Sequence, residues 1–309
     1  MNGQSLTSVL AASATQAPAS AAIYAVQPFA LDELRTRASG LLALLTGQDD
    51  SAGACRSDRA DWKSDDSQTT ITLPQGARAV LYHASGAIDY RSGLAPFAAS
   101  FAQPVEREGL IRQLTERAAR LELPAWLGEQ GSLSFERLWQ MKAQGSDRTG
   151  KNSEVLLTRA VGAWRHAVAG IAVLGAASVA LRLAGDGTVD AFSLRIRPSA
   201  AETVDTATTI APELAARQLA QHLASLLGNG RDELPPDAIA EARMLFGYLD
   251  LGKRKAQQVL APSYVAQITV VHKFERQAYV LAVPATERSY QQLQVAGNEG
   301  LATGARRGC

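Results

Sequence analysis

The stretch Gly170–Pro198, "GIAVLGAASVALRLAGDGTVDAFSLRIRP", decides the fold class of this chain. Apolar side chains alternate with small or polar ones on both sides of the tripeptide "GDG", Gly185–Gly187. A period of two is typical of half-buried strands, and glycine supplies the positive φ of a tight turn. The stretch therefore predicts an antiparallel hairpin that ends at Pro198. The alternating residues are Ile171, Val173, Val179, Leu181 and Leu183 before the turn, and Phe192, Leu194 and Ile196 after it.

One arrangement, a helix followed by three strands, occurs twice along the chain. This repetition predicts an α+β fold with two helix-on-antiparallel-sheet modules, residues 71–198 and 199–309, the second ending in a short tail. The first set is a helix at 105–123 with strands near 155–166, 171–184 and 188–197; the second is a helix from Pro212 with strands near 240–250, 263–273 and 276–283.

The first seventy residues have a different composition. Residues 1–29 are rich in Ala, Ser, Thr and Gln, and such a segment buries little apolar surface, so we expect a disordered tail or a weak helix. Residues 30–47 repeat leucine at helical spacing and close on Gly47, which predicts an amphipathic helix. Residues 48–70 are polar and are interpreted as a linker.

Charge and hydropathy exclude two classes of partner. Lys and Arg number 31 against 30 Asp and Glu, a net charge of +1 in 309 residues. Binding of nucleic acid needs a clustered basic face, so no nucleic-acid partner is predicted. The longest uncharged apolar run, Ala167–Leu181, has 15 residues and is shorter than the roughly 18–20 that span a bilayer, so no transmembrane segment is predicted.

The sequence does not indicate the cellular compartment of the protein. A secretory signal begins with a basic segment, and the first basic residue here is Arg35, so no signal peptide is recognised and the compartment stays open. The two cysteines, Cys55 and Cys309, cannot form a disulfide framework or a CxxC metal site. Whether they pair with each other also stays open.

Residues Gly145–Asn152, "GSDRTGKN", resemble the phosphate loop G-x-x-x-x-G-K-[ST], with Asn152 in place of the hydroxyl residue. Gly145, Gly150 and Lys151 would hold phosphate if the loop joined a buried parallel strand to a helix. The preceding "LSFERLWQMKA" fits a short helix or a strand, but its charges do not suit a buried strand. The following sequence favours a strand, so we interpret the segment as a solvated loop.

No catalytic constellation stands out. The histidines show no helical zinc spacing. His272 and Glu275 flank an expected hairpin turn at Phe274–Glu275 and would meet as a base and its orienter, against the commoner interpretation of polar strand ends. The candidates for an active site assembled from dispersed residues are His272, Glu275, His166 and Asp250. The sequence predicts no cofactor and no metal site.

The deciding stretch resembles the propeptide modules of thermolysin-like and fungalysin-like peptidases, the FTP/PepSY group, although Ala172 stands where that family usually has proline. The resemblance covers about residues 164–287 and includes no peptidase domain. It implies a cystatin-like fold of a helix on a curved antiparallel sheet, a peptidase or envelope partner, and export. The matching positions are Gly170, Ile171, Val173, Gly175, Asp186, Gly187, Val189 and Pro198, with Pro262 and Tyr264 in the second half.

Three functions follow from these observations. The first is a non-catalytic protein-interaction protein, acting as a propeptide-like inhibitor, chaperone or envelope binding protein through a sheet edge or a concave face. The second is an enzyme, a hydrolase by preference, with a dispersed active site. The third is a structural or assembly component that docks through the Ala-rich N-terminus.

Overall fold

The computed structural model describes residues 5–47, 60–73, 76–176, 178–227, 238–272 and 275–291. The fold is α+β and mostly sheet, as the sequence predicts, with four α-helices in the described part. The chain forms two compact units, each discontinuous in sequence. Unit 1 comprises residues 1–25, 202–249 and 259–309, and unit 2 comprises residues 26–201 and 250–258.

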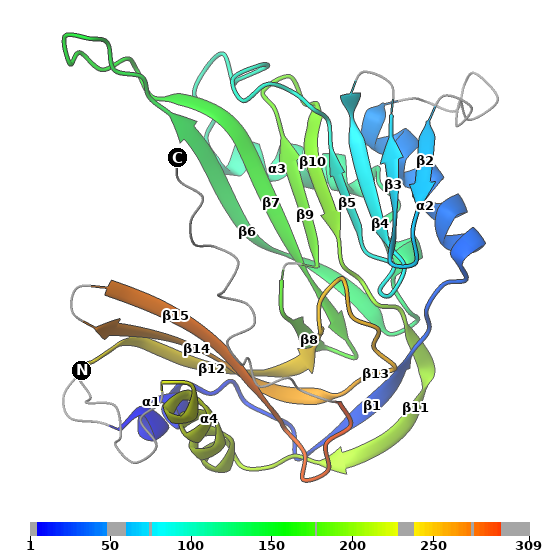
Figure 1. Cartoon of the computed structure of the whole chain (residues 1–309), viewed down its shortest axis with the longest axis vertical. Helices are drawn as coiled ribbons and strands as arrows, with labels where there is room; N and C mark the ends of the chain where they lie inside the picture. The colour runs from blue at the N-terminus through cyan, green and yellow to red at the C-terminus, as the bar shows by residue number, and fades with distance from the viewer. Residues whose placement is uncertain are drawn as a thin grey trace. The chain divides into compact units, whose positions relative to one another are not determined.

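Unit 2 is built on a long antiparallel sheet whose strands run in the order β2-β3-β4-β5-β10-β9-β7, with β6 on the free side of β7 (Figure 1). The short strand β8 also pairs with β7. The strands are β2 (Asp61–Ser64), β3 (Gln68–Thr72), β4 (Arg78–Tyr82), β5 (Ile88–Arg91), β6 (Gly131–Ala143), β7 (Leu156–Val168), β8 (Ile171–Leu174), β9 (Val179–Leu183) and β10 (Val189–Leu194).

Two helices cover one face of this sheet: α2 (Leu31–Thr46) and α3 (Arg107–Ala119), followed by a short 3-10 helix at Leu123–Trp126. Leu110 and Leu114 of α3 are fully buried and belong to the same apolar core as the sheet. Arg117 of α3 donates to the carbonyl of Leu44 at the end of α2, which links the two helices on that face.

The predicted hairpin is confirmed as β9–β10, with Leu183 opposite Val189, Leu181 opposite Phe192 and Val179 opposite Leu194. These six side chains are buried in the core under the helices. The period of two places Val179, Leu181 and Leu183 there, and likewise Phe192 and Leu194. A bulge between Val189 and Ala191 brings Val189 to the same face. The expected single strand 171–184 is instead two strands, β8 and β9. The interruption begins at Gly175, whose φ of +128° is open to glycine but rarely to other residues.

Unit 1 contains a three-stranded antiparallel sheet in the order β12-β14-β15, with β12 (Ile239–Leu249), β14 (Pro262–His272) and β15 (Glu275–Pro284) close to the predicted bounds. Helices α1 (Leu6–Ser13) and α4 (Pro212–Leu226) pack on each other and against β12 and β15, respectively. A second sheet has the order β11-β1-β13, from β11 (Ser199–Thr208), β1 (Ser20–Val26) and β13 (Val259–Leu260).

Among residues 5–29 the structure has the helix α1 and the strand β1, so the expectation of a disordered tail was wrong there, while the alternative of a weak helix fits α1. Ser5 caps α1 by accepting from the Ser8 amide, and Leu10 and Ile23 are fully buried in unit 1. Mean composition hid these elements because Ala is a strong helix former and because a few apolar residues at the right spacing suffice to anchor a short helix and a strand.

The proposed linker and module boundaries also need correction. Residues 61–64 and 68–72 of the expected linker 48–70 form β2 and β3, while residues 48–59 lie outside the described part. The expected break at 198/199 lies close to the unit boundary after Ala201. However, residues 1–25 belong to unit 1 and residues 250–258 to unit 2, and this interleaving of the chain leaves no local signal in the sequence.

Candidate functional site: a long edge strand

Strand β6 is the feature of unit 2 best placed to meet a partner. It has 13 residues, and among the described strands it pairs only with β7, from Gly131 opposite Val168 to Ala143 opposite Leu156. A strand paired on one side presents unused backbone N–H and C=O groups along its other side. Figure 1 shows β6 and β7 as a long two-stranded arm at the border of the sheet.

A β-bulge at Glu136 divides β6 into two halves with opposite facing. Phe135 lies opposite Trp164 and Arg137 lies opposite Ala163, so Glu136 is the extra residue. Before the bulge, Phe135 points to the core and its ring meets that of Trp164 edge-on at 5.3 Å. One inserted residue reverses which face each later side chain takes.

After the bulge, the inward residue is Leu138, which is buried opposite Gly162. An added Cβ on Gly162 would lie 3.2 Å from Cδ1 of Leu114 in α3, so this side of the strand pair faces the helices. Trp139 and Met141 therefore point away from the helices, and they are 44% and 42% exposed. The bulge has turned two large apolar side chains outward.

The charges around this apolar pair are mostly positive. The Arg137 guanidinium lies 5.4 Å from the centre of the Trp139 ring, and Lys142 is exposed at the end of the strand. Glu136 is the one acidic residue of β6, and its carboxylate is held by Arg165 at 2.8 Å. The charges of β6 after the bulge that have no ion-pair partner are therefore positive.

The phosphate-loop resemblance falls at the tip of the β6–β7 arm. Lys151 is followed by β7 and not by a helix, and Gly150 adopts φ +83° within the turn. The Asp147 carboxylate accepts from the amides of Thr149 and Lys151, so the loop donors that would face a phosphate already bind an internal anion. The pKa of Asp147 is lowered by the hydrogen bond from the Thr149 hydroxyl and by those from the two amides.

His166, on β7, is buried and its Nε2 has no hydrogen-bond partner. Burial lowers its pKa to about 4, with the nearby Asp250 carboxylate acting weakly in the opposite direction. Asp250 itself accepts from Arg197 Nε at 2.7 Å, and Arg197 also donates to the carbonyls of Gly252 and Lys255. The Arg197 contacts hold residues 250–255 in place, and burial is what keeps the imidazole of His166 neutral.

His272 and Glu275 are backbone partners at the ends of β14 and β15 in unit 1. Glu275 is exposed and belongs to β15 instead of the turn, which corrects the expected turn at Phe274–Glu275. The side chain of His272 lies outside the described part, so the base-and-orienter hypothesis stays a prediction.

The residues that match the propeptide family lie in turns, in the core or at the start of a strand. Gly170 (φ +80°) and Gly187 (φ +84°) sit in the β7–β8 and β9–β10 turns, and Asp186 accepts from the Thr188 amide in the latter. Val173 is buried, and the Pro198 carbonyl accepts from the Gln27 amide. In unit 1, Pro262 begins β14, and the buried Tyr264 donates its hydroxyl to the Ile210 carbonyl.

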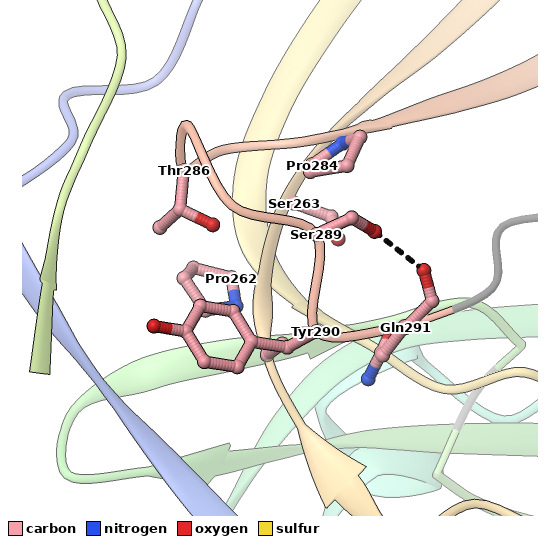
Figure 2. A pocket seen from close by; sticks show the side chains of 8 residues that line it. Pro262, Ser263, Pro284, Thr286, Ser289, Tyr290 and Gln291 are labelled. Atoms are coloured by element: carbon pink, nitrogen blue, oxygen red, sulfur yellow. Dashed lines mark hydrogen bonds between the residues drawn. The ribbon is translucent and has the colours of Figure 1, made fainter. Parts of the chain in front are cut away.

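A small hollow in unit 1 lies beside Pro262 (Figure 2), where the Ser289 hydroxyl donates to the Gln291 carbonyl. The volume open to a water-sized molecule is about 0 Å³, whereas ligand pockets usually have ~300–1,000 Å³. The hollow is therefore too small for a substrate. Its lining residues are Ala261, Pro262, Ser263, Pro284, Thr286, Ser289, Tyr290 and Gln291.

A buried ionic cluster inside the unit 2 sheet was not predicted from the sequence. The Asp190 carboxylate accepts from Arg159 Nε at 2.8 Å and from the Ser92 hydroxyl at 2.9 Å. Arg159 is 2% exposed and also donates to the carbonyls of Ala95 and Ala98. Asp190 also pairs with Arg182 of β9 at 2.8 Å, so the cluster ties β7, β9 and β10 to the loop after β5.

A search of known family models and a search of curated proteins find no match for this chain. Within the described residues, no three His, Cys, Asp or Glu side chains are grouped as metal ligands. No helix of the described part is long and apolar enough to cross a membrane. Cys55 and Cys309 lie outside the described residues.

Proposed function

We propose that this chain is a non-catalytic protein-interaction protein that binds an extended segment of a partner along β6. The observation that carries the proposal is a long strand at a sheet border whose bulge turns Trp139 and Met141 toward solvent. Strand addition uses the free backbone groups of such an edge for affinity, and side chains on alternate positions for specificity.

The pairing register limits the length of the contact. The extra residue of the first bulge is Glu136 of β6, whereas that of the second is Thr158 of β7, so β6 itself has no inserted residue from Arg137 to Ala143. A bulge ends regular pairing, and an added strand would therefore match about this segment. Trp139 lies next to its centre, where an aromatic side chain contributes most to an interface.

The likeness to propeptide modules bears on the partner. We propose that the two units act as cystatin-like, propeptide-type modules, with a peptidase or an envelope protein as the partner and an exported protein as the setting. The support for this part is the match in Gly170–Pro198 and at Pro262 and Tyr264.

The test compares the wild-type chain with the double variant Trp139→Lys/Met141→Lys, using Phe97→Lys as the matched control. Phe97 is 65% exposed in a loop of the same unit, so this control also exchanges an exposed apolar side chain for lysine. Each chain is used to capture proteins from lysate and culture medium, and the complex is then studied by hydrogen exchange.

The expected result is a partner retained by the wild type and by Phe97→Lys but lost with the double variant, with the β6 amides protected in the complex. Retention by all three chains, without added protection of β6, would contradict binding at this edge. A turnover activity abolished by a single substitution such as His166→Ala, with both Lys variants fully active, would instead establish an enzyme.

A further inference from the structure

We infer that the segment which pairs with β6 is acidic, with carboxylates alternating with apolar side chains. This inference rests on the proposed function and specifies the chemistry of its partner. It is carried by the distribution of charge on the β6–β7 arm, which departs from the near-neutral balance of the whole chain.

Four cations, Arg137, Lys142, Arg148 and Lys151, lie between residues 137 and 151, and all four are exposed. The same part of the arm, up to the start of β7, has two exposed carboxylates, Asp147 and Glu154, and the hydrogen-bond partners of Asp147 are a hydroxyl and two amides, which are neutral. The four cations outnumber these two carboxylates, so the arm carries an excess of positive charge. Complementary charge steers association and suppresses the wrong partner.

The two cations of β6 lie on opposite faces of this edge. Arg137, Trp139 and Met141 share the face away from the helices, whereas Lys142 has the opposite parity. A paired strand with apolar residues on the outward face would cover Trp139 and Met141. Its alternate residues would reach toward Lys142, so carboxylates at those positions would meet a cation.

A second copy of the chain fits this edge less well. The one carboxylate of β6 is Glu136, which sits in the bulge and is paired with Arg165 at 2.8 Å. A second β6 would therefore bring Arg137 and Lys142 to the interface without a free carboxylate to receive them. Like charges on neighbouring strands are destabilising, so the charges favour a different, acidic strand.

The experiment measures binding of fluorescently labelled eight-residue peptides, capped at both ends, to the full-length chain by anisotropy. The probes are an alternating Glu-Val peptide, an alternating Lys-Val peptide, and a block peptide of four Glu followed by four Val. We expect the Glu-Val peptide to bind at least tenfold more tightly than either of the others, and to weaken as salt is raised. Arg137→Glu/Lys142→Glu should reverse the preference toward Lys-Val.

Each other outcome contradicts a distinct step. If Glu-Val and Lys-Val bind equally and Trp139→Lys weakens both, strand addition stands and the acidic preference is overturned. If neither alternating peptide binds, or if Trp139→Lys changes nothing, binding along β6 itself fails. If sedimentation shows a dimer that Trp139→Lys dissociates, the occupant of the edge is a second copy and the inference is wrong.

Discussion

The two borders of the unit 2 sheet differ in almost every property that controls pairing. At one border, β2 has four residues, and its exposed Lys63 lies 3.0 Å from Asp61. At the other, β6 has 13 residues and exposes Trp139 and Met141. Short, charged edges resist pairing with other chains, whereas long apolar edges invite it. Of the two borders of the same sheet, β6 is the one built to be paired.

The exposure of Trp139 and Met141 on β6 is caused by a single inserted residue. Without the bulge at Glu136, Trp139 and Met141 would have the parity of Leu133 and Phe135, which pack on the core. β2 has no such irregularity, and its one large apolar residue, Trp62, packs partly into the core. Facing, more than composition, therefore separates the two borders.

The largest effect is expected from a substitution in the middle of the sheet, which would destabilise both borders together. Asp190→Ala would leave the Arg159 guanidinium, 2% exposed, without its carboxylate. Loss of one partner of a buried ion pair typically costs ~3–5 kcal/mol, and we expect that loss in the free energy of unfolding by urea. Hydrogen exchange should then show β6 and β2 losing protection together.

The control for this variant is Asp186→Ala, which removes an exposed carboxylate from the β9–β10 turn. Its cost should stay below about 1 kcal/mol because a single exposed turn hydrogen bond is lost. Equal destabilisation by the two substitutions would show that the buried cluster does not stabilise the sheet.

Acid should destabilise the β6 border of the sheet before the β2 border. His166 lies on β7 opposite Leu133 of β6, and its pKa falls from 6.5 to about 4 on folding. Between those values the unfolded chain binds more protons than the folded one, so stability falls as pH falls from 6.5 to 4. The full difference is about 3 kcal/mol, and hydrogen exchange should show β6 and β7 losing protection before β2 and β3.

The matched variant for the acid experiment is His166→Leu, which keeps an apolar side chain in the buried site and removes the titration. Its unfolding free energy should depend less on pH across the same interval, by about one proton. An unchanged pH slope would mean that the proton is taken up elsewhere.

The sequence predicts strands that border a clear turn well and predicts β6 poorly. The β9–β10 hairpin and the β12, β14 and β15 strands are evident from their mostly regular period of two and from their turns, although the β9–β10 and β12–β14 pairs each contain one bulge. Around β6, the core residues Leu133, Phe135 and Leu138 are spaced by two and then three positions, which fits neither a regular strand nor a clear helix. The outward-facing apolar pair of β6 was missed because a bulge becomes evident only when the partner strand is known.

The buried charges illustrate a second limit. Arg159 and Asp190, and likewise Arg197 and Asp250, are far apart in sequence and meet only through strand pairing and loop packing. Their residue types resemble those of solvated charges anywhere else in the chain. The strand at Ser20–Val26 was missed for the opposite reason, because a composition rich in small residues masked a few well-placed apolar ones, and the helix at Leu6–Ser13 was expected only as a weak alternative to disorder.

Protecting β6 should change binding far more than folding. Trp139→Lys/Met141→Lys places exposed lysines on this edge, as Lys63 is exposed on β2. Both side chains are close to half exposed, so we expect the free energy of unfolding to change by about 1 kcal/mol or less. Binding of the alternating Glu-Val peptide should nevertheless weaken at least tenfold. Equal loss of stability and binding would indicate that β6 is part of the structural core.

Removing the protection from β2 should have the smallest effect. In Asp61→Val/Lys63→Val, the exposed ion pair is replaced by apolar residues of high strand propensity. Stability should shift by no more than about 0.5 kcal/mol, as at most surface sites, and the Glu-Val peptide should gain no measurable affinity in the anisotropy assay. Four residues offer too few backbone groups to hold an added strand, so charge alone is not what separates the two borders. A gain in affinity comparable to that of β6 would show that charge, and not length and facing, decides which border binds.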